Sequence, residues 1–254
     1  MIELKKDKLA VKIAESVAEM GKAAAEDIYA AIKEVLAQKD EINIIFAAAP
    51  SQNATLEALL QKNIEWGRIN AFHMDEYIGL KKGSTASFQT YLKEHIFKFK
   101  EFKSVNFIDP TASGIEEECE RYEQLLRKYP VDIVVLGIGE NGHIAFNDPP
   151  VADFNDKVLV KPVKLDEKCR NQQVNDGCFA TIDEVPLYAL TLTVPALVSA
   201  KYMFCSVPYF TKADAVYEML TTEKIDEHCP CAILRLHDNA VLYCDKESSS
   251  RLGL

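Results

Sequence analysis

Residues 133–136, Ile-Val-Val-Leu, form a short apolar run that ends at a loop with three glycines in positions 137–142. A continuous β-branched run of this length is typical of a strand buried on both faces of a parallel sheet. Glycines permit the tight turns and close backbone approach that a loop beside a ligand requires. The loop then carries His143 and Asp148. Ligands bind beyond the carboxyl ends of strands in an open α/β sheet, so this stretch predicts a reaction centre, with a purely structural loop histidine as the alternative.

The rest of the chain alternates apolar runs with helical patterns. Apolar residues recurring every three or four positions predict a long amphipathic helix over residues 7–38. We expect strands at residues 42–46, 68–74, 105–108, 133–136, 201–207 and 240–244, with ordered structure also at 188–194. We expect further helices from residue 51, over 84–97 and 116–129, from 211, and near 230–235. This alternation predicts a Rossmann-like α/β fold: a doubly wound, mostly parallel sheet with helices on both faces.

Domain organisation follows from the absence of repeats, low-complexity tracts and linkers. We expect one domain over residues 1–254, a length that can bury a sizeable core. Residues 151–186 are polar and weakly periodic, which suits a lid, a subunit contact or plain flexible surface.

Charge and composition exclude several classes of partner. The net charge of −10 argues against non-specific binding to nucleic acid or to an anionic membrane surface, so an anionic substrate needs a local cationic pocket. No apolar run is long enough to span a membrane, and the first residues lack the apolar stretch of a signal peptide. The cytoplasm is therefore the expected location.

Polar residues after the expected strand 42–46 suit an anion. Ser51, Asn53 and Thr55 lie in or next to the first turn of the expected helix, where free backbone N–H groups favour phosphate or carboxylate. A plain helix cap by Ser51 is the alternative. Lys212 again lies in the first helical turn after a strand, where a cation suits an anionic ligand unless it is solvated surface.

Two adjacent acids, Asp75 and Glu76, directly follow the expected strand 68–74. One can serve as a general base while the other stays structural. The seven cysteines are odd in number and mostly scattered through apolar segments, as expected of reduced core thiols. The cluster His228-Cys229-Pro230-Cys231 lacks a second ligand pair at zinc-site spacing, so we expect no metal there.

Four collinear segments together resemble the glucosamine-6-phosphate deaminase/isomerase family. They are Phe72-His-Met-Asp-Glu-Tyr-Ile-Gly-Leu80, Gly137-Ile-Gly-Glu-Asn-Gly-His-Ile-Ala-Phe-Asn-Asp-Pro149, Val185-Pro-Leu-Tyr-Ala-Leu-Thr191 and Leu234-Arg-Leu-His-Asp-Asn-Ala240. The resemblance implies a Rossmann-like fold without a nicotinamide cofactor, and we expect neither a cofactor nor a metal. It also implies conversion of a 2-amino-2-deoxyhexose 6-phosphate, of glucosamine or galactosamine, into a ketose 6-phosphate with release of ammonia.

Roles for the candidate catalytic residues follow from the same resemblance. His143 would move a proton to or from the ring oxygen, with Asp148 orienting it where the family usually has Glu. Asp75 would move the proton between C2 and C1, with Glu76 the weaker candidate. Asn141 stands where many members have an Asp paired with the histidine, and some members have Asn as here.

The phosphate-binding residues depart further from the family. Ser51, Thr55 and Lys212 match its phosphate site, and Asn53 lies in the same turn. The family's arginine motif is not reproduced over residues 174–180, so Arg170 is the candidate substitute.

Two other functions remain open from the sequence. The related 6-phosphogluconolactonases hydrolyse their substrate and need no C2 base. A catalytically silent sugar-phosphate-binding regulator would also fit the altered loop and Asn141. The resemblance further suggests a homo-oligomer that binds a small amino-sugar phosphate.

Overall fold

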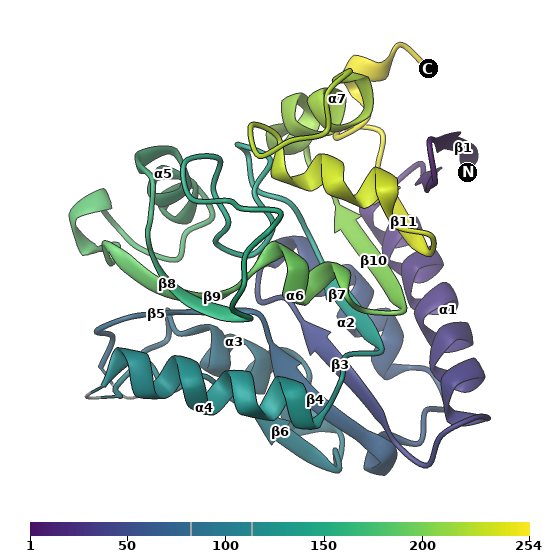
Figure 1. The fold of residues 1–254 in the computed structure, drawn as a ribbon. Helices are drawn as coiled ribbons and strands as arrows, with labels where there is room; N and C mark the ends of the chain where they lie inside the picture. The colour runs from purple at the N-terminus through teal and green to yellow at the C-terminus, as the bar shows by residue number, and fades with distance from the viewer. Residues whose placement is uncertain (82, 113) are drawn as a thin grey trace.

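The central element of the computed structural model, which describes residues 1–81, 83–112 and 114–254, is a sheet of eight strands within those ranges. Its spatial order is β1-β2-β11-β10-β7-β3-β4-β6, and all neighbours are parallel except β1 and β2 (Figure 1). These strands are β1 Ile2–Lys6, β2 Leu9–Ile13, β3 Ile42–Phe46, β4 Ile69–His73, β6 Ser104–Asn106, β7 Ile133–Leu136, β10 Tyr202–Val207 and β11 Ala240–Cys244.

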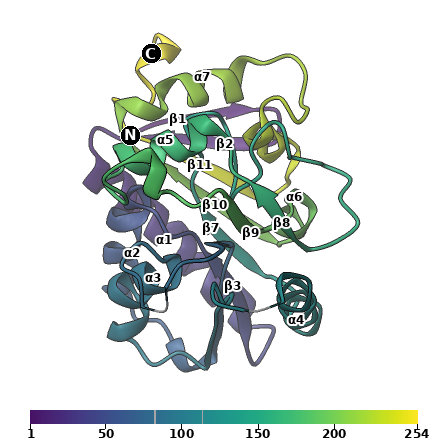
Figure 2. The same ribbon diagram turned by 90° about the vertical axis from the view of Figure 1, so that its left-hand side faces the viewer.

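Helices cover both faces of this sheet. Figure 2 shows α1, α2 and α3 on one side and α4 and α6 on the other. The α-helices are α1 Val17–Leu36, α2 Asn53–Leu60, α3 Phe88–His95, α4 Ile115–Lys128, α5 Glu167–Asn175, α6 Val194–Val198 and α7 Ala213–Thr221. The shorter 3-10 helices are η1 Pro50–Gln52, η2 Trp66–Arg68, η3 Phe97–Phe99, η4 Ile182–Glu184, η5 Phe210–Lys212, η6 Pro230–Leu236 and η7 Ser250–Leu252.

The two hydrophobic cores explain why β7 reads as a continuous apolar run. Ile133 and Val135 face the core that contains α1 and α2, whereas Val134 and Leu136 face the core under α4, α6 and α7. All four side chains are fully buried. A strand between two layers of helices has no solvent face, so it carries no polar alternation. The doubly wound α/β prediction is therefore confirmed.

The amino terminus differs from the expected helix over residues 7–38. Residues 2–13 form the antiparallel pair β1–β2, and β2 joins the sheet beside β11. Leu9, Val11 and Ile13 are buried on alternate positions, which is the two-residue period of a strand. The helix α1 begins only after Ser16, whose side chain accepts a hydrogen bond from the Glu19 backbone N–H.

A second sheet of three strands, β5-β9-β8, lies beside the first in the described residues. It comprises β5 Asp75–Tyr77, β8 Val160–Lys164 and β9 Tyr188–Leu192, all antiparallel. The polar segment 151–186 thus contains a strand and the helix α5, more order than its sequence indicated. The expected helix near 230–235 is the 3-10 helix η6.

None of the described helices combines the length and the apolar character needed to cross a membrane.

Candidate active site

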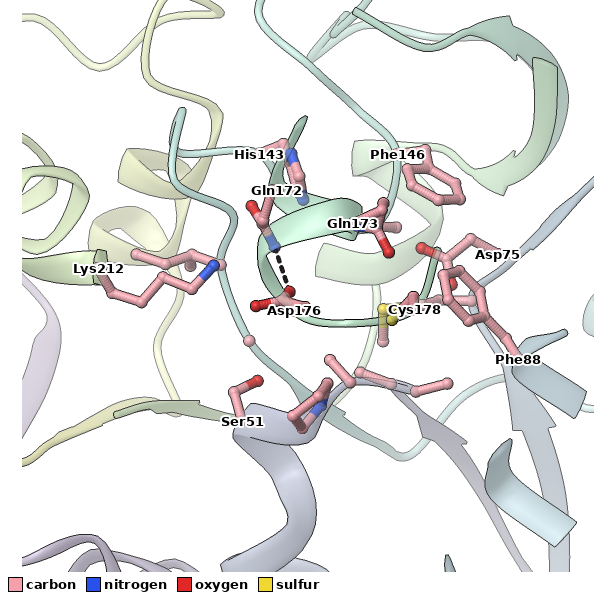
Figure 3. Close-up of a pocket in the computed structure, with 18 of the residues that line it drawn as sticks. Ser51, Asp75, Phe88, His143, Phe146, Gln172, Gln173, Asp176, Cys178 and Lys212 are labelled. Atoms are coloured by element: carbon pink, nitrogen blue, oxygen red, sulfur yellow. Dashed lines mark hydrogen bonds between the residues drawn. The ribbon is translucent and has the colours of Figure 1, made fainter. Parts of the chain in front are cut away.

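A cleft opens at the carboxyl ends of β3, β4, β7 and β10, where Figure 3 shows side chains from several elements facing one another. This is the edge at which open α/β sheets bind ligands. The polar and ionisable side chains that line the cleft are those of Ser51, Asp75, His143, Gln172, Gln173, Asp176, Cys178, Tyr209 and Lys212. Asp75, which follows β4, and His143, which follows β7, thus share one cleft.

Glycines in the loop after β7 make room for the imidazole. A Cβ on Gly139 would lie 2.2 Å from Cε1 of His143, so no larger residue fits beside the ring. The Gly139 N–H also donates to the His143 carbonyl at 2.9 Å. Gly142 has a φ of +79°, the left-handed region that favours glycine. The loop therefore fixes the ring through its own backbone.

The imidazole is oriented by a buried carboxylate. His143 Nδ1 lies 2.8 Å from Oδ1 of Asp148, which is fully buried. Burial alone would raise the pKa of Asp148, but hydrogen bonds from His143, Asn141 and the Asp166 backbone N–H outweigh it and lower that pKa. Asp148 is therefore a carboxylate at neutral pH, and Nε2 is the ring nitrogen left for a ligand.

Asn141 supports the carboxylate rather than the ring. Its Nδ2 donates to Asp148 at 2.9 Å and to Asp166 at 3.2 Å, and its Oδ1 accepts the His143 backbone N–H at 3.1 Å. It does not line the cleft. Its amide is therefore placed to hold Asp148 next to His143.

One cluster of possible metal ligands occurs within the described ranges. His143, Asp148 and Cys169 bring one donor atom each within 4.8 Å of one another. Burial raises the pKa of the Cys169 thiol well above its usual value, and Asp148 and Asp166 raise it further. Asp148 already accepts hydrogen bonds from Asn141 and pairs with the His143 ring, so these contacts account for the cluster without a metal.

Asp75 opens β5 and reaches the cleft with little solvent exposure, 7% of its surface. Its carboxylate has no hydrogen-bond donor among residues 1–81, 83–112 and 114–254. Burial, and secondarily the charge of Glu76, raise the pKa of Asp75 well above its usual value. A carboxyl group with a raised pKa holds a proton more readily than a solvated one, which suits a group that takes and returns a proton.

Glu76 points away from the cleft. Its carboxylate accepts the backbone N–H groups of Tyr77, Phe88 and Gln89 and the Ser87 hydroxyl. These bonds tie β5 to the start of α3. The structure thus gives Glu76 a structural position, and it does not line the cleft.

Lys212 is a buried cation that faces the cleft (Figure 3). It is 4% exposed, and its ammonium has no hydrogen bond or ion pair with any residue that the structure describes. Burial lowers the pKa of Lys212, while the carboxylates of Asp176 and Glu140 oppose that shift. An unpaired, desolvated cation in the same cleft as the Ser51 hydroxyl is suited to an anion.

Three of the residues predicted to bind the phosphate also lie outside the cleft lining. Thr55 Oγ1 lies 2.8 Å from Ser206 Oγ in the core, and Asn53 accepts the Tyr91 hydroxyl. Arg170 donates Nη2 to the backbone carbonyls of Ile182 and Val185 at 2.5 and 3.0 Å. These bonds fix the segment after α5, and the structure does not bring Arg170 to the cleft.

Sequence reasoning missed the contribution of α5. Gln172, Gln173 and Asp176 face the cleft from this helix and its end. The Tyr77 hydroxyl donates to Gln173 Oε1 at 2.7 Å, which fixes that amide. The polar cluster at 169–173 was the available signal, but its weak periodicity hid which side chains face inward.

Comparisons with known proteins agree on one family. The sequence model of the family described as glucosamine-6-phosphate isomerases/6-phosphogluconolactonase matches residues 15–243. A glucosamine-6-phosphate deaminase of Bacillus cereus is 33% identical over 242 residues, covering 95% of this chain and 87% of that protein. A glucosamine-6-phosphate deaminase of Clostridium acetobutylicum is 35% identical over 195 residues, covering 76% and 78%.

Solved structures give the same picture. A monomeric glucosamine-6-phosphate deaminase superposes with a TM-score of 0.86 at 29% identity, covering 94% of this chain and 98% of that one. A 6-phosphogluconolactonase from Thermotoga maritima superposes with a TM-score of 0.75 at 22% identity, covering 93% and 99%. At that identity the second likeness concerns the fold alone.

Proposed function

Because the chain belongs to the glucosamine-6-phosphate isomerase/6-phosphogluconolactonase family, we propose that it is an amino-sugar-phosphate isomerase/deaminase. It converts a 2-amino-2-deoxyhexose 6-phosphate, of glucosamine or galactosamine, into a ketose 6-phosphate and ammonia. One observation carries this proposal: a carboxyl group of raised pKa, an oriented imidazole and a buried unpaired ammonium line the same cleft. A lactonase would need no base such as Asp75.

The phosphate end of the substrate binds at Lys212. Its ammonium and the Ser51 hydroxyl supply a charge-assisted and a neutral hydrogen bond to phosphate oxygens. The buried cation has no protein partner among the described residues, so phosphate binding supplies the missing one. Thr55, Asn53 and Arg170 act indirectly, by holding the surrounding backbone.

His143 opens the sugar ring. With Nδ1 bonded to the Asp148 carboxylate, Nε2 is free to exchange a proton with the ring oxygen. Asp148 keeps the ring in one tautomer, and Asn141 keeps Asp148 in place. Asp148 and Asn141 are therefore positioning residues, because neither lines the cleft.

Asp75 moves the proton along the open chain. It takes the proton from C2 of the aldehyde form while the C1 oxygen gains a proton, which gives an enolamine. It then returns the proton to C1 on the same face as the amine nitrogen loses one, which leaves a C1 alcohol and an imine at C2. Water adds to that carbon, ammonia leaves, and the ketose 6-phosphate remains. The raised pKa of Asp75 suits a group that acts as base and then as acid.

Ammonia and ketose 6-phosphate measured from each hexosamine 6-phosphate test the proposal. We expect turnover on at least one of them, and a loss of about 10² to 10⁴ in kcat for Asp75→Asn. Absence of turnover on both hexosamine phosphates would contradict it. Hydrolysis of 6-phosphogluconolactone that is unaffected by Asp75→Asn would favour the lactonase, and tight hexose-phosphate binding without turnover would favour a silent regulator.

We further propose that residues 1–254 act as one catalytic domain with the segment 151–186 covering the cleft. Its helix α5 and the residue that follows it contribute three of the lining side chains, which supports this role. We also propose a homo-oligomer in the cytoplasm. The similar solved deaminase is described as monomeric, so light scattering of the purified protein decides the oligomeric state.

A further inference from the structure

A carboxylate stands opposite the single lysine of the cleft in the described residues. Asp176 ends α5 and lines the same wall as Gln172, and Figure 3 shows the Lys212 ammonium pointing toward it. Gln172 Nε2 donates to Asp176 Oδ2 at 3.3 Å, and the Asp176 N–H donates to the Gln172 carbonyl at 2.8 Å. The carboxylate is thus tied to the helix rather than free to swing away.

The charge of Asp176 acts on groups from several elements around the cleft. Burial raises the pKa of Cys178 to about 11, and Asp176 adds to that shift. Burial also raises the pKa of Tyr209 and of Tyr91, again with a contribution from Asp176. Lys212 is affected by Asp176 and by Glu140 from the loop after β7. The negative charge of Asp176 therefore lies at the end of the cleft that carries the Lys212 cation.

The negative charge of Asp176 opposes the binding of a dianion. A phosphate at Lys212 meets one lysine, with Asp176 nearby and Glu140 behind the cleft lining. Like charges in a partly desolvated site repel more strongly than in bulk water. A carboxylate accepts hydrogen bonds and donates none, so it bonds to a phosphate oxygen only where that oxygen keeps its proton.

We propose that Asp176 is a specificity-determining residue that sets the charge the cleft accepts, weakening binding of doubly charged phosphate and favouring the form that keeps one proton. This inference rests on the proposed function, since it concerns the phosphate end of the same substrate. In the preferred form, the P–OH group donates to Asp176 while other phosphate oxygens accept from Lys212 and Ser51.

Binding of glucose 6-phosphate, which lacks the amine, tests this without turnover. Phosphate esters lose their second proton at a pKa of about 6, so the ligand is mostly a dianion at pH 8 and mostly a monoanion at pH 5. The dissociation constant is measured by ³¹P NMR titration for the wild type, Asp176→Asn and Lys212→Gln. At pH 8 we expect Asp176→Asn to bind on the order of tenfold more tightly than the wild type, and Lys212→Gln more weakly.

At pH 5 the gain should disappear, because little dianion is left to be repelled and the P–OH group donates a weaker hydrogen bond to a neutral amide oxygen than to the Asp176 carboxylate. The other ionisable groups of the cleft are the same in both proteins, so the ratio of the two constants removes their contribution. The exposed Asp183, changed to Asn, is the control for net charge, and it should leave the affinity unchanged.

An Asp176→Asn affinity at pH 8 that equals or falls below the wild-type value would overturn the inference, as would a gain of equal size at both pH values or in Asp183→Asn. If the wild type releases ammonia but Asp176→Asn binds no more tightly at pH 8, only the role of Asp176 is overturned. If Asp176→Asn binds more tightly at pH 8 but the wild type releases no ammonia, only the proposed function is overturned.

Discussion

Burial of the Asp75 carboxyl group supports its proposed catalytic role but lowers the stability of the folded protein at high pH. Burial raises the pKa of Asp75 in the folded protein, so its stability contribution is greatest at low pH and is lost as pH rises through the folded-state pKa. We predict that Asp75→Asn is more stable than the wild type at pH 8, by a few degrees in Tm, and that the difference narrows toward pH 4. Thermal unfolding across this pH range measures it.

The same variant should lose activity, so stability and kcat change in opposite directions. Glu76→Gln is the matched comparison. Burial raises the pKa of Glu76 as well, but its carboxylate accepts four hydrogen bonds that a glutamine amide with one acceptor oxygen cannot replace, so this substitution should lower Tm. A lower Tm for Asp75→Asn at pH 8 would show that Asp75 is stabilised by a partner that the cleft geometry does not contain.

Asn141 gives a second prediction, because it donates to two carboxylates at once. Asn141→Asp removes both donated bonds and adds a negative charge beside Asp148 and Asp166. We expect a loss of about 1–3 kcal/mol in the free energy of unfolding at neutral pH and a drop in kcat of at least tenfold. Denaturant unfolding and steady-state kinetics check this. Unchanged stability would mean that Asn141 does not hold Asp148.

Site residues were predictable where the reaction requires a particular residue type at a particular place after a strand. They were less predictable where the role depends on the direction in which the side chain points. Asp75, His143 and Ser51 reach the cleft as their positions after strands indicated. Thr55 and Arg170 have suitable chemistry, but Thr55 turns toward Ser206 in the core and Arg170 toward backbone carbonyls. Residue type does not reveal which side of a turn a side chain occupies.

The loop after β7 is the element that places the imidazole, and Gly139 is its critical position. Gly139→Ala puts a Cβ within 2.2 Å of the His143 ring, so the ring must move away from Asp148. We predict a kcat lower by about 10² or more and a stability loss of about 1–3 kcal/mol. Gly67→Ala is the control, since nothing lies within 4 Å of a Cβ there. Equal activity of the two variants would contradict the role of the loop.

Helices and strands were predictable from the sequence where the spacing of apolar residues fits only one of the two. The strands at 42–46 and 133–136 were correct because a run buried on both faces has no competing pattern. The helix predicted over residues 7–13 was wrong. Leu9 and Ile13 are four residues apart, so they fit a helix as well as the alternating strand that also contains Val11. The sheet β5-β9-β8 depends on pairing between distant segments, which local periodicity does not report.

At the scale of the whole molecule, the small sheet is tied to the large one through the site. The Leu192 N–H donates to the Met74 carbonyl at 2.8 Å, and the Phe146 N–H donates to Thr191 Oγ1 at 3.0 Å. We predict that residues 1–254 unfold in a single calorimetric transition, with matching calorimetric and van't Hoff enthalpies. Two resolved transitions would show that the small sheet is an independent unit.

The central claim is that one sugar phosphate spans Asp75, His143 and Lys212. A crystal structure of Asp75→Asn soaked with glucosamine 6-phosphate tests it most directly, because loss of the base traps the substrate. The account predicts the phosphate at Lys212 and Ser51, C1 and C2 facing the residue 75 amide, and the C5 oxygen, free or still in the ring, next to His143 Nε2. A sugar bound elsewhere, or with its phosphate at the His143 end of the cleft, would contradict it.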